Sequence, residues 1–500
     1  MPVTNSVRDP DFWWHLRTGQ LILDGHALIQ TDPFTYIAST HHWTMHEWLT
    51  EVLFAGLNHV GGLAIIVVTL SVVTWLGLLA ILRRAQLRKP GHIAAGLGLL
   101  LATIAGYPVW GPRAQMITFA LTCLLLFLVE RHFAKGGRAI WLLVPIFLVW
   151  VNLHSGFIIG AAFLAVIVAV ELALRALGRS QVDPARLRTL VLVLLACCAI
   201  VVINPSGPHI YLYPFETQGS AAQQSLILEW HSPDFHDTAV RAFEAMLLTL
   251  AIMVAITRKV RPRDAVLVLA TTAMALQSVR HIALFIAAAT PVWIEQADMV
   301  GRRVFPTVVA RMEAARTRRG AMLFGAVVAL CSVLVAGQLA VSASVRPESL
   351  TYARSFPVCA ARWLDSGPSG LNVFNQYGEG GYLARSIAPH GDRIFIFGDA
   401  ALMGDDLLRS YGDVETVRPS WERILRDSHT DLVLFDEGTP LANVLAASPR
   451  WVAAYRDPYS VAYVPAGSPL IAKLPTQPTY ARDSTDTCAL LDRLGLGSGS

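Results

Sequence analysis

Long apolar stretches separated by short polar loops constrain this chain more than any other feature. About ten of them lie between residues 62 and 341, and each helical crossing of a bilayer needs roughly 20 apolar residues. A hydrophobic content of 54% and a mean hydropathy of +0.48 agree with this pattern. The sequence predicts an α-helical multi-pass membrane protein with spans over 62–82, 92–108, 114–130, 139–153, 157–174, 189–203, 243–257, 264–279, 281–295 and 320–341.

Basic residues gather in alternate loops between these spans. The loops after the odd-numbered spans carry arginine clusters, such as Arg83-Arg84 and Arg302-Arg303, whereas the other short loops hold few. An excess of Lys and Arg marks the cytoplasmic side of a membrane protein. The same distribution accounts for the net charge of +4, so we expect no nucleic-acid partner. Both the segment before the first span and the segment after the last one are expected to lie outside the cytoplasm.

The composition changes along the chain and predicts four parts. Residues 1–61 form an extracytoplasmic first loop that ends in an amphipathic helix over 45–59, lying on the membrane interface. Residues 62–341 form the transmembrane bundle. Residues 342–487 alternate short β-rich and helix-like runs, which predicts an extracytoplasmic α/β domain with a partly parallel sheet. Residues 488–500 form a tail. Cys359 and Cys488 lie in a compartment where a disulfide between them could persist.

The run from Arg8 to Gly19 carries the most pointed chemical signal. Asp9 and Asp11 stand on either side of a proline. Two carboxylates could hold Mg²⁺ or Mn²⁺, which prefer hard oxygen ligands, or one of them could take a proton from an acceptor hydroxyl. The alternative is an Asp-Pro turn beside interfacial tryptophans. His15 and Arg17 in the same run are candidates for substrate binding.

A second polar run precedes the first span. His46 and Glu47 could bind a sugar, or could start the interfacial helix with the carboxylate favourably placed at its N-terminus. Asp32 is expected to be a turn or cap residue.

Polar residues recur at the outward ends of the expected spans. Ionisable groups at membrane depth are costly and usually face a cavity or a partner. Two arginines there could clamp a lipid-linked phosphate, or could reach out to lipid headgroups. A histidine beside the Ser155-Gly156 break could equally be structural. The candidates for substrate binding are Arg113, Asn152, His154, Glu229, His231, Arg280 and His281.

A glycine-rich run in the C-terminal domain follows an expected strand. Tyr377 lies in the run 374–383, whose backbone could approach a phosphate, although the glycine spacing matches no dinucleotide motif and no P-loop lysine follows. A tight structural turn is the default interpretation, and the same holds for Gly398-Asp399 after the next strand.

Five of these runs together resemble bacterial multi-span proteins of the GT-C glycosyltransferase class. They are Asp9-Pro-Asp-Phe-Trp-Trp-His-Leu-Arg-Thr-Gly19, His46-Glu-Trp-Leu-Thr-Glu-Val-Leu53, Trp150-Val-Asn-Leu-His-Ser-Gly-Phe157, Ile227-Leu-Glu-Trp-His-Ser-Pro-Asp234 and Ser278-Val-Arg-His-Ile-Ala-Leu-Phe285. The run Asn375-Gln-Tyr-Gly-Glu-Gly-Gly-Tyr-Leu383 is distantly similar to a region of oligosaccharyltransferase catalytic subunits.

The resemblance implies an enzyme of the bacterial inner membrane and cell envelope. Members of the class take sugars from polyprenyl-phosphate carriers and use an acidic motif in the first outward loop, which corresponds here to Asp9 and Asp11. It implies the bilayer, a polyprenyl-phosphate-linked sugar and a glycan, lipid or protein acceptor as partners. The class normally has a helix before this loop, which would make about eleven spans. The alternative is a non-catalytic assembly or polysaccharide-export protein with a glycan-binding outer domain.

Overall fold

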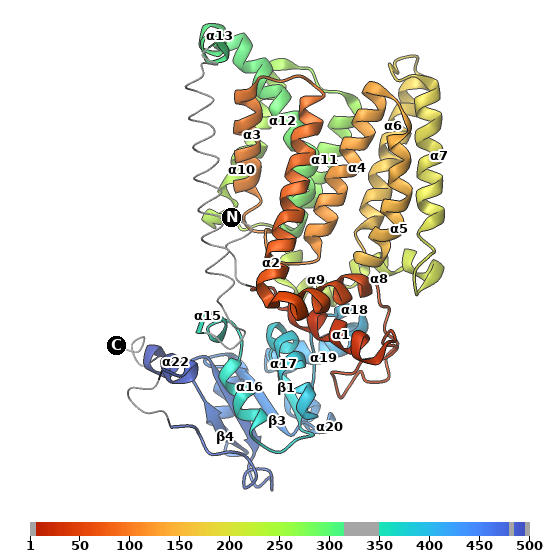
Figure 1. Cartoon of the computed structure of the whole chain (residues 1–500). Coiled ribbons are helices and arrows are strands. Elements are labelled where there is room, and N and C mark those ends of the chain that lie inside the picture. The colour runs from red at the N-terminus through yellow and green to blue at the C-terminus, as the bar shows by residue number, and fades with distance from the viewer. Residues whose placement is uncertain (1–6, 315–349, 480–484, 496–500) are drawn as a thin grey trace. The chain divides into compact units, whose positions relative to one another are not determined.

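The computed structural model describes residues 7–314, 350–479 and 485–495 (Figure 1). Backbone contacts divide the chain into two compact units. In the described residues, the helical unit comprises 67–214 and 227–314, and the mixed unit comprises 7–66, 215–226, 350–479 and 485–495. Residues 7–66 therefore share a compact unit with the C-terminal α/β part, whereas the sequence pattern alone separates 1–61 from 342–487.

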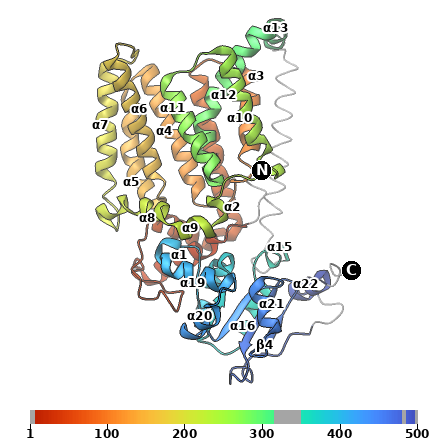
Figure 2. The same ribbon diagram turned by 180° about the vertical axis from the view of Figure 1, so that it is seen from behind.

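The helical unit is a set of helices with nearly parallel axes, seen from opposite sides in Figures 1 and 2. Every expected span within the described residues coincides with a helix, and the span over 320–341 lies outside them. The helices are the later part of α2 (Trp48–Gln86), then α3 (His92–Ala105), α4 (Gln115–Lys135), η2 (Arg138–Leu142), α5 (Leu143–Leu153), α6 (Phe157–Ala176), α7 (Pro184–Ile200), α10 (Arg241–Thr257), α11 (Pro262–Gln277), α12 (Ile282–Val304) and α13 (Pro306–Ala314).

Among the described residues, four helical stretches are long and apolar enough to cross a membrane. They are Trp48–Gln86, Gln115–Lys135, Phe157–Ala176 and Thr238–Thr257, and His92–Ala105 and Arg138–Leu153 are shorter apolar helices. These helices support a membrane protein without confirming about ten spans. Short helices connect the long ones: η3 (Gly207–Tyr211), α8 (Tyr213–Gly219), α9 (Ala221–Leu226), η4 (Leu228–Trp230), η5 (Thr238–Val240) and η6 (Val279–His281).

Helix α2 is interrupted where the expected interfacial helix meets the expected first span. Gly62 has φ +64°, and the neighbouring Gly61 also leaves the helical conformation. A positive φ is readily adopted by glycine and is unfavourable for residues with a Cβ atom. The predicted helix over 45–59 is thus present as the first turns of α2, from Trp48 onward, and its place on a membrane interface stays a prediction.

A buried ion-pair network joins several helices of the helical unit. Arg88 is paired with Asp264 at 2.9 Å, with Glu130 at 3.2 Å and with Glu295 at 2.8 Å. The side chains of Arg88 and Asp264 are only 1% and 2% exposed. From the sequence, arginines such as Arg88 are expected only to mark the cytoplasmic side. The structure gives this one a second role, because it binds carboxylates on α4, α11 and α12.

Arg84 extends this network to the proline position in α12. Pro291 lies inside α12 and has no N–H to donate to the carbonyl of Ala287 one turn earlier. Arg84 Nη1 donates to that carbonyl at 3.3 Å, while its Nη2 binds Asp264 at 3.0 Å. The guanidinium therefore satisfies a backbone acceptor that the proline leaves open.

The mixed unit is built around a five-stranded sheet with the order β2-β1-β3-β5-β4. Strand β1 is parallel to both β2 and β3, and β5 is antiparallel to both β3 and β4. This confirms the expected partly parallel sheet. The strands are β1 (Asn372–Asn375), β2 (Arg393–Ile394), β3 (Leu432–Asp436), β4 (Trp451–Arg456) and β5 (Ser460–Pro465).

Helices and short turns surround the sheet, and α21 packs beside β4 (Figure 2). They are α1 (Asp11–Gly25), the first part of α2, α9, α15 (Leu350–Ala353), α16 (Val358–Asp365), η7 (Tyr377–Glu379), α17 (Gly380–Ser386), η8 (Ala388–His390), α18 (Ala400–Met403), α19 (Asp405–Glu415), α20 (Trp421–Asp427), α21 (Pro440–Ala447) and α22 (Thr487–Gly495).

The N-terminal segment extends one edge of the sheet. Tyr36 N donates to the carbonyl of Ile394 at 3.2 Å, and Ile394 N donates to the carbonyl of Phe34 at 3.0 Å. Both parts of the chain thus share backbone hydrogen bonds, which explains why they form one compact unit.

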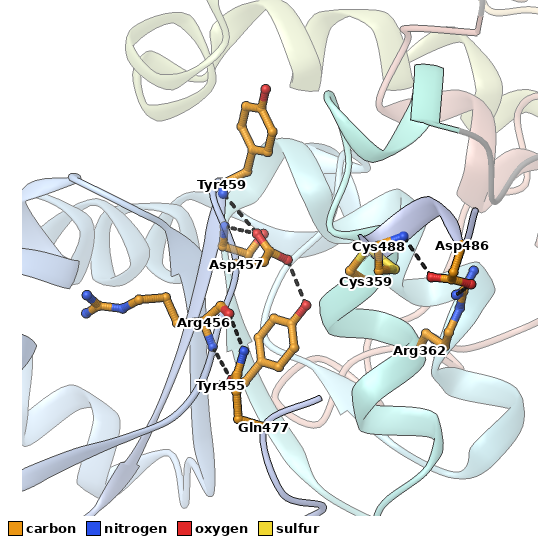
Figure 3. The surroundings of a disulfide bond; sticks show 10 residues. Cys359, Arg362, Tyr455, Arg456, Asp457, Tyr459, Gln477, Asp486 and Cys488 are labelled. Atoms are coloured by element: carbon orange, nitrogen blue, oxygen red, sulfur yellow. Dashed lines mark hydrogen bonds and ion pairs between the residues drawn. A yellow bond between two sulfur atoms is a disulfide. The ribbon is translucent and has the colours of Figure 1, made fainter. Parts of the chain in front are cut away.

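A disulfide joins Cys359 on α16 to Cys488 on α22 (Figure 3). The pairing that the sequence leaves open is therefore present. The Arg362–Asp486 ion pair, at 2.9 Å, lies beside it and joins the same two parts of the chain. Position 488, taken from sequence as the start of a tail, instead lies in a helix tied to the domain.

Candidate functional site

The site residues expected from sequence fall in both units. In the mixed unit, Asp9 and Asp11 lie at the start of α1 and are both partly exposed. Asp11 N donates to Asp9 Oδ1 at 3.1 Å, and Phe12 N donates to the Asp9 carbonyl at 3.3 Å. Asp9 thus forms the turn that starts the helix, as the turn interpretation predicts. This leaves Asp11 as the better candidate for chemistry.

Two glycines allow α1 to approach the α/β part of the mixed unit. A Cβ atom at Gly398 would lie 1.6 Å from Asp11 Oδ1, and one at Gly381 would lie 2.2 Å from the carbonyl oxygen of Pro10. Such distances are far inside van der Waals contact. Gly381 faces backbone and therefore requires glycine, whereas a Cβ atom at Gly398 would have to displace the Asp11 carboxylate. Gly398 and Asp11 are 387 positions apart in sequence, and the turn after β2 therefore forms one side of the Asp11 environment.

Tyr377 and Asp399 belong to the same region. Tyr377 donates its hydroxyl to the Gly398 carbonyl at 3.4 Å. Burial, and then the charges of Asp11 and Asp399, raise the pKa of Tyr377 well above 10, so its hydroxyl stays neutral and can only exchange hydrogen bonds. Asp399 accepts from Trp43 Nε1 at 2.7 Å and from Leu402 N at 3.1 Å. Asp399 is therefore a structural cap, as expected.

His15 lies between two glutamates at the start of α2. Its Nδ1 is 3.2 Å from Glu51 Oε1 and its Nε2 is 3.5 Å from Glu47 Oε2. His46 Nε2 lies 3.2 Å from the other Glu47 oxygen. Burial opposes a charge on His15, but the hydrogen bond to Glu51 and the charges of Glu47, Glu51 and Asp11 outweigh it, raising the pKa from 6.5 to about 9.

These side chains are enclosed by the fold. His15, Glu47 and Glu51 are 8%, 7% and 2% exposed, so they support the site from beneath its surface. Arg17, the remaining candidate on α1, is half-buried and donates to Gln20 at 3.5 Å.

In the helical unit, η4 and η6 bring several candidates together. Arg113 forms an ion pair with Glu229 at 2.5 Å. Ser278 donates its hydroxyl to the Glu229 carbonyl at 2.8 Å, and Val279 N donates to the carbonyl of His231 at 3.1 Å.

Arg280 and His281 both lie near the Trp230 ring. The Arg280 guanidinium is 4.7 Å from the Trp230 ring centroid, a distance that permits a cation–π interaction. His281 Nδ1 lies 3.3 Å from the Met274 carbonyl. Arg280 and His281 are both partly exposed, so this part of the helical unit remains accessible.

Asn152 and His154 have structural partners. Asn152 donates to the carbonyls of Leu148 at 2.8 Å and Ile203 at 3.2 Å. His154 Nδ1 accepts from Gly156 N at 2.8 Å and lies 3.0 Å from the Thr118 hydroxyl. Both side chains are buried and satisfy polar groups around the break between α5 and α6. These contacts favour the structural interpretation of His154.

The donor set at Asp9 and Asp11 does not by itself fit a metal ion. Within the described residues, no group of three or more His, Cys, Asp or Glu side chains is placed to share one. We therefore derive no step through Mg²⁺ or Mn²⁺. Metal dependence stays a prediction, to be tested by comparing transfer with and without a chelator.

Sequence reasoning missed Glu51, Trp14 and the contact of Gly398 with Asp11. Glu51 follows Glu47 by four positions, and His15 follows Asp11 by four. Residues with this spacing share one face of a helix, so the pattern could have pointed to Glu51. The contact of Gly398 with Asp11 has no local signal.

The sequence matches no family model and no curated protein. Solved structures do resemble the fold. Archaeal oligosaccharyltransferase AglB from Archaeoglobus fulgidus, in complex with an inhibitory peptide and a dolichol-phosphate, aligns with a TM-score of 0.57 and 13% identity over 86% of this chain and 65% of that chain. The chain thus spans slightly less than two thirds of that enzyme. Another structure of the Archaeoglobus enzyme, tethered to an acceptor peptide, aligns with a TM-score of 0.53 and 12% identity over 93% of this chain and 73% of that one.

ArnT from Cupriavidus metallidurans bound to undecaprenyl phosphate aligns with a TM-score of 0.48 and 13% identity, over 93% of this chain and 95% of that one. The similarity to the archaeal structures concerns the fold, which is that of a GT-C glycosyltransferase. The resemblance to the GT-C class that the sequence indicates is confirmed at the level of the fold.

Proposed function

We propose that this protein is a membrane glycosyltransferase that moves a sugar from a polyprenyl-phosphate carrier to an acceptor outside the cytoplasm. The observation that carries the proposal is Asp11, a partly exposed carboxylate held at the start of α1 in a chain with a GT-C fold. The archaeal structure with a dolichol-phosphate and a peptide supports a lipid carrier and an acceptor as the two partners. The acceptor is a glycan, a lipid or a protein.

In the proposed reaction, Asp11 is the general base. Its carboxylate takes the proton of an acceptor hydroxyl while the hydroxyl oxygen attacks C1 of the sugar. The bond between C1 and the phosphate oxygen breaks, the electron pair leaves with the polyprenyl phosphate, and the configuration at C1 inverts. A base held in place by hydrogen bonds needs little reorganisation at the moment of reaction.

The departing phosphate needs positive charge. Arg280 is the stronger candidate, since its partly exposed guanidinium lies over Trp230 and forms no ion pair within the part of the chain that the structure describes. Arg113 is paired with Glu229, so it would have to exchange that carboxylate for a phosphate oxygen. Arginine binds phosphate through two parallel N–H groups, which suits either residue for this role.

The orientation belongs to the same proposal. We place the mixed unit on the outer side of a bacterial inner membrane. The alternation of arginine-rich loops supports this orientation, and so does the Cys359–Cys488 disulfide, because disulfides persist mainly outside the reducing cytoplasm.

Incubating the purified full-length protein with labelled polyprenyl-phosphate sugars and candidate acceptors tests the function. We expect wild type to consume one of these donors and Asp11→Asn to consume none while remaining folded. Asp24→Asn, an exposed carboxylate at the other end of α1, is the matched control and should turn over normally. Normal turnover by Asp11→Asn would remove Asp11 from the mechanism. Glycan binding without donor consumption would favour the non-catalytic assembly or export role.

A further inference from the structure

A continuous series of contacts connects two buried glutamates to the Asp11 carboxylate. Glu47 and Glu51 hold the two ring nitrogens of His15. The His15 ring lies against the indole of Trp14 in a tilted arrangement, with 3.5 Å between ring centroids and 33° between their planes. Trp14 Nε1 donates to Asp11 Oδ1 at 3.2 Å. Every residue of the series belongs to the mixed unit. The series ends at the carboxylate of Asp11, the general base of the proposed reaction.

The geometry leaves the Trp14 indole few alternatives. Trp14 is 3% exposed and is enclosed by Trp43, at 5.9 Å between ring centroids, and by Phe397, at 5.5 Å. The His15 ring is nearer still, at 3.5 Å between ring centroids. Rotation of the indole would break the hydrogen bond to Asp11, so the position of His15 fixes the direction of the Nε1–H donor.

We infer that Glu47 and Glu51 are positioning residues, which orient the Asp11 carboxylate through His15 and Trp14. This inference rests on the proposed function for its catalytic meaning, but its structural content is independent of any substrate. It also gives His15 and Glu47 a role different from the substrate contacts that the sequence suggests. Both are too buried to touch a sugar in this conformation.

Charge accounts for the choice of residues in this series. A neutral imidazole has one donor and one acceptor nitrogen, whereas a protonated imidazole donates from both and can bind two carboxylates. His46 Nε2 lies 3.2 Å from the other Glu47 oxygen; burial opposes a charge on His46, but the hydrogen bond and the charge of Glu47 outweigh it and raise its pKa. The alternating order of His46, Glu47, His15 and Glu51 pairs each charge with an opposite one, as burial requires.

A double-mutant cycle tests the inference. The variants are Glu51→Gln, which keeps the shape and removes the charge, Trp14→Phe, which keeps a ring and removes the donor, and the combination of both. We expect each single change to lower kcat about tenfold or more with KM nearly unchanged, because a misplaced catalytic group slows the chemical step. The combination should cost little more than Trp14→Phe alone, since Glu51 acts through Trp14. If the losses of kcat in the two single variants multiply in the double variant, the inference is overturned.

A second readout needs no substrate. A protonated imidazole stacked on an indole quenches its fluorescence, so the Trp14 signal, taken as wild type minus Trp14→Phe, should be weak in wild type. The Trp14 signal should rise in Glu51→Gln and in His15→Gln. It should stay unchanged in the control Glu437→Gln, whose side chain pairs with Arg456 on β4, the edge strand opposite β2. An unchanged Trp14 signal in a folded Glu51→Gln protein would contradict the inference. If the fluorescence changes as expected but wild type consumes no donor, the proposed function fails and the positioning contacts stand.

Discussion

Asp11 Oδ1 lies where the side chain of residue 398 would begin, so the carboxylate and the glycine fit only together. We predict that Gly398→Ala displaces Asp11 and destabilises the mixed unit by about 1–3 kcal/mol, the usual cost of overpacking. Transfer should be lost with it. Gly378→Ala is the control, because a Cβ atom there meets nothing within 4 Å. Thermal unfolding and transfer assays on both variants check this, and a Gly398→Ala protein with wild-type behaviour would contradict the packing described.

His15 should make stability depend on pH. Its pKa is 6.5 unfolded and about 9 folded, so the folded state binds the extra proton more tightly. The stabilisation is fully present below pH 6.5 and is lost as pH rises towards about 9. We expect the unfolding midpoint of wild type to fall over this range more steeply than that of His15→Gln. Parallel curves for the two proteins would show that His15 carries no such proton.

Glu379 should make stability depend on pH in the same direction as His15, although here the retained proton keeps the side chain neutral. Burial, and then the charge and hydrogen bonding of Asp436 and the charge of Asp457, raise its pKa well above 4.5. The folded state therefore retains a proton that the unfolded chain releases, and stability falls as pH rises above 4.5. We predict that Glu379→Gln stabilises the protein at neutral pH by about 1–2 kcal/mol, since a neutral amide avoids a buried charge. Chemical unfolding at pH 5 and pH 8 measures it, and no gain at pH 8 would count against a protonated Glu379.

Arg88 should be among the most sensitive positions of the helical unit. Arg88→Met leaves Asp264 and Glu130 with less compensating charge in a buried site, and breaking such a pair costs about 3–5 kcal/mol. Arg302→Met removes an exposed pair with Asp298, which is worth less than about 1 kcal/mol. Unfolding of both variants in the same detergent compares the two losses. Similar losses would mean that the network contributes no more than a surface pair.

Hydropathy predicts much of this fold and very little of its assembly. The expected spans coincide with helices in the described residues because burial in lipid requires long apolar runs, which are visible locally. Alternating β-rich and helix-like runs predict the sheet because this pattern is also visible locally in the sequence. The pairing of Trp43 with Asp399, 356 positions away, leaves no local trace. Arg88 looks like any other loop arginine until its partners are known.

The candidate site shows the same division. The Asp-Pro-Asp run draws attention to Asp9 and Asp11 from sequence, yet only the contacts tell them apart: Asp9 starts a helix and Asp11 accepts from Trp14. The His46-Glu47 pair is noticed for its polarity, but its burial beneath α1 depends on tertiary packing. Residue type therefore selects candidates, and packing assigns their roles.

The shared sheet edge of Thr35 and Ile394 has a practical consequence for anyone who wishes to study the C-terminal part in isolation. A fragment that starts at residue 350 would lack the segment that hydrogen-bonds to β2 and would uncover Phe397 and Tyr382, which α1 and its following loop now cover. A water-soluble version would need residues 7–60 supplied on the same polypeptide or as a separate peptide.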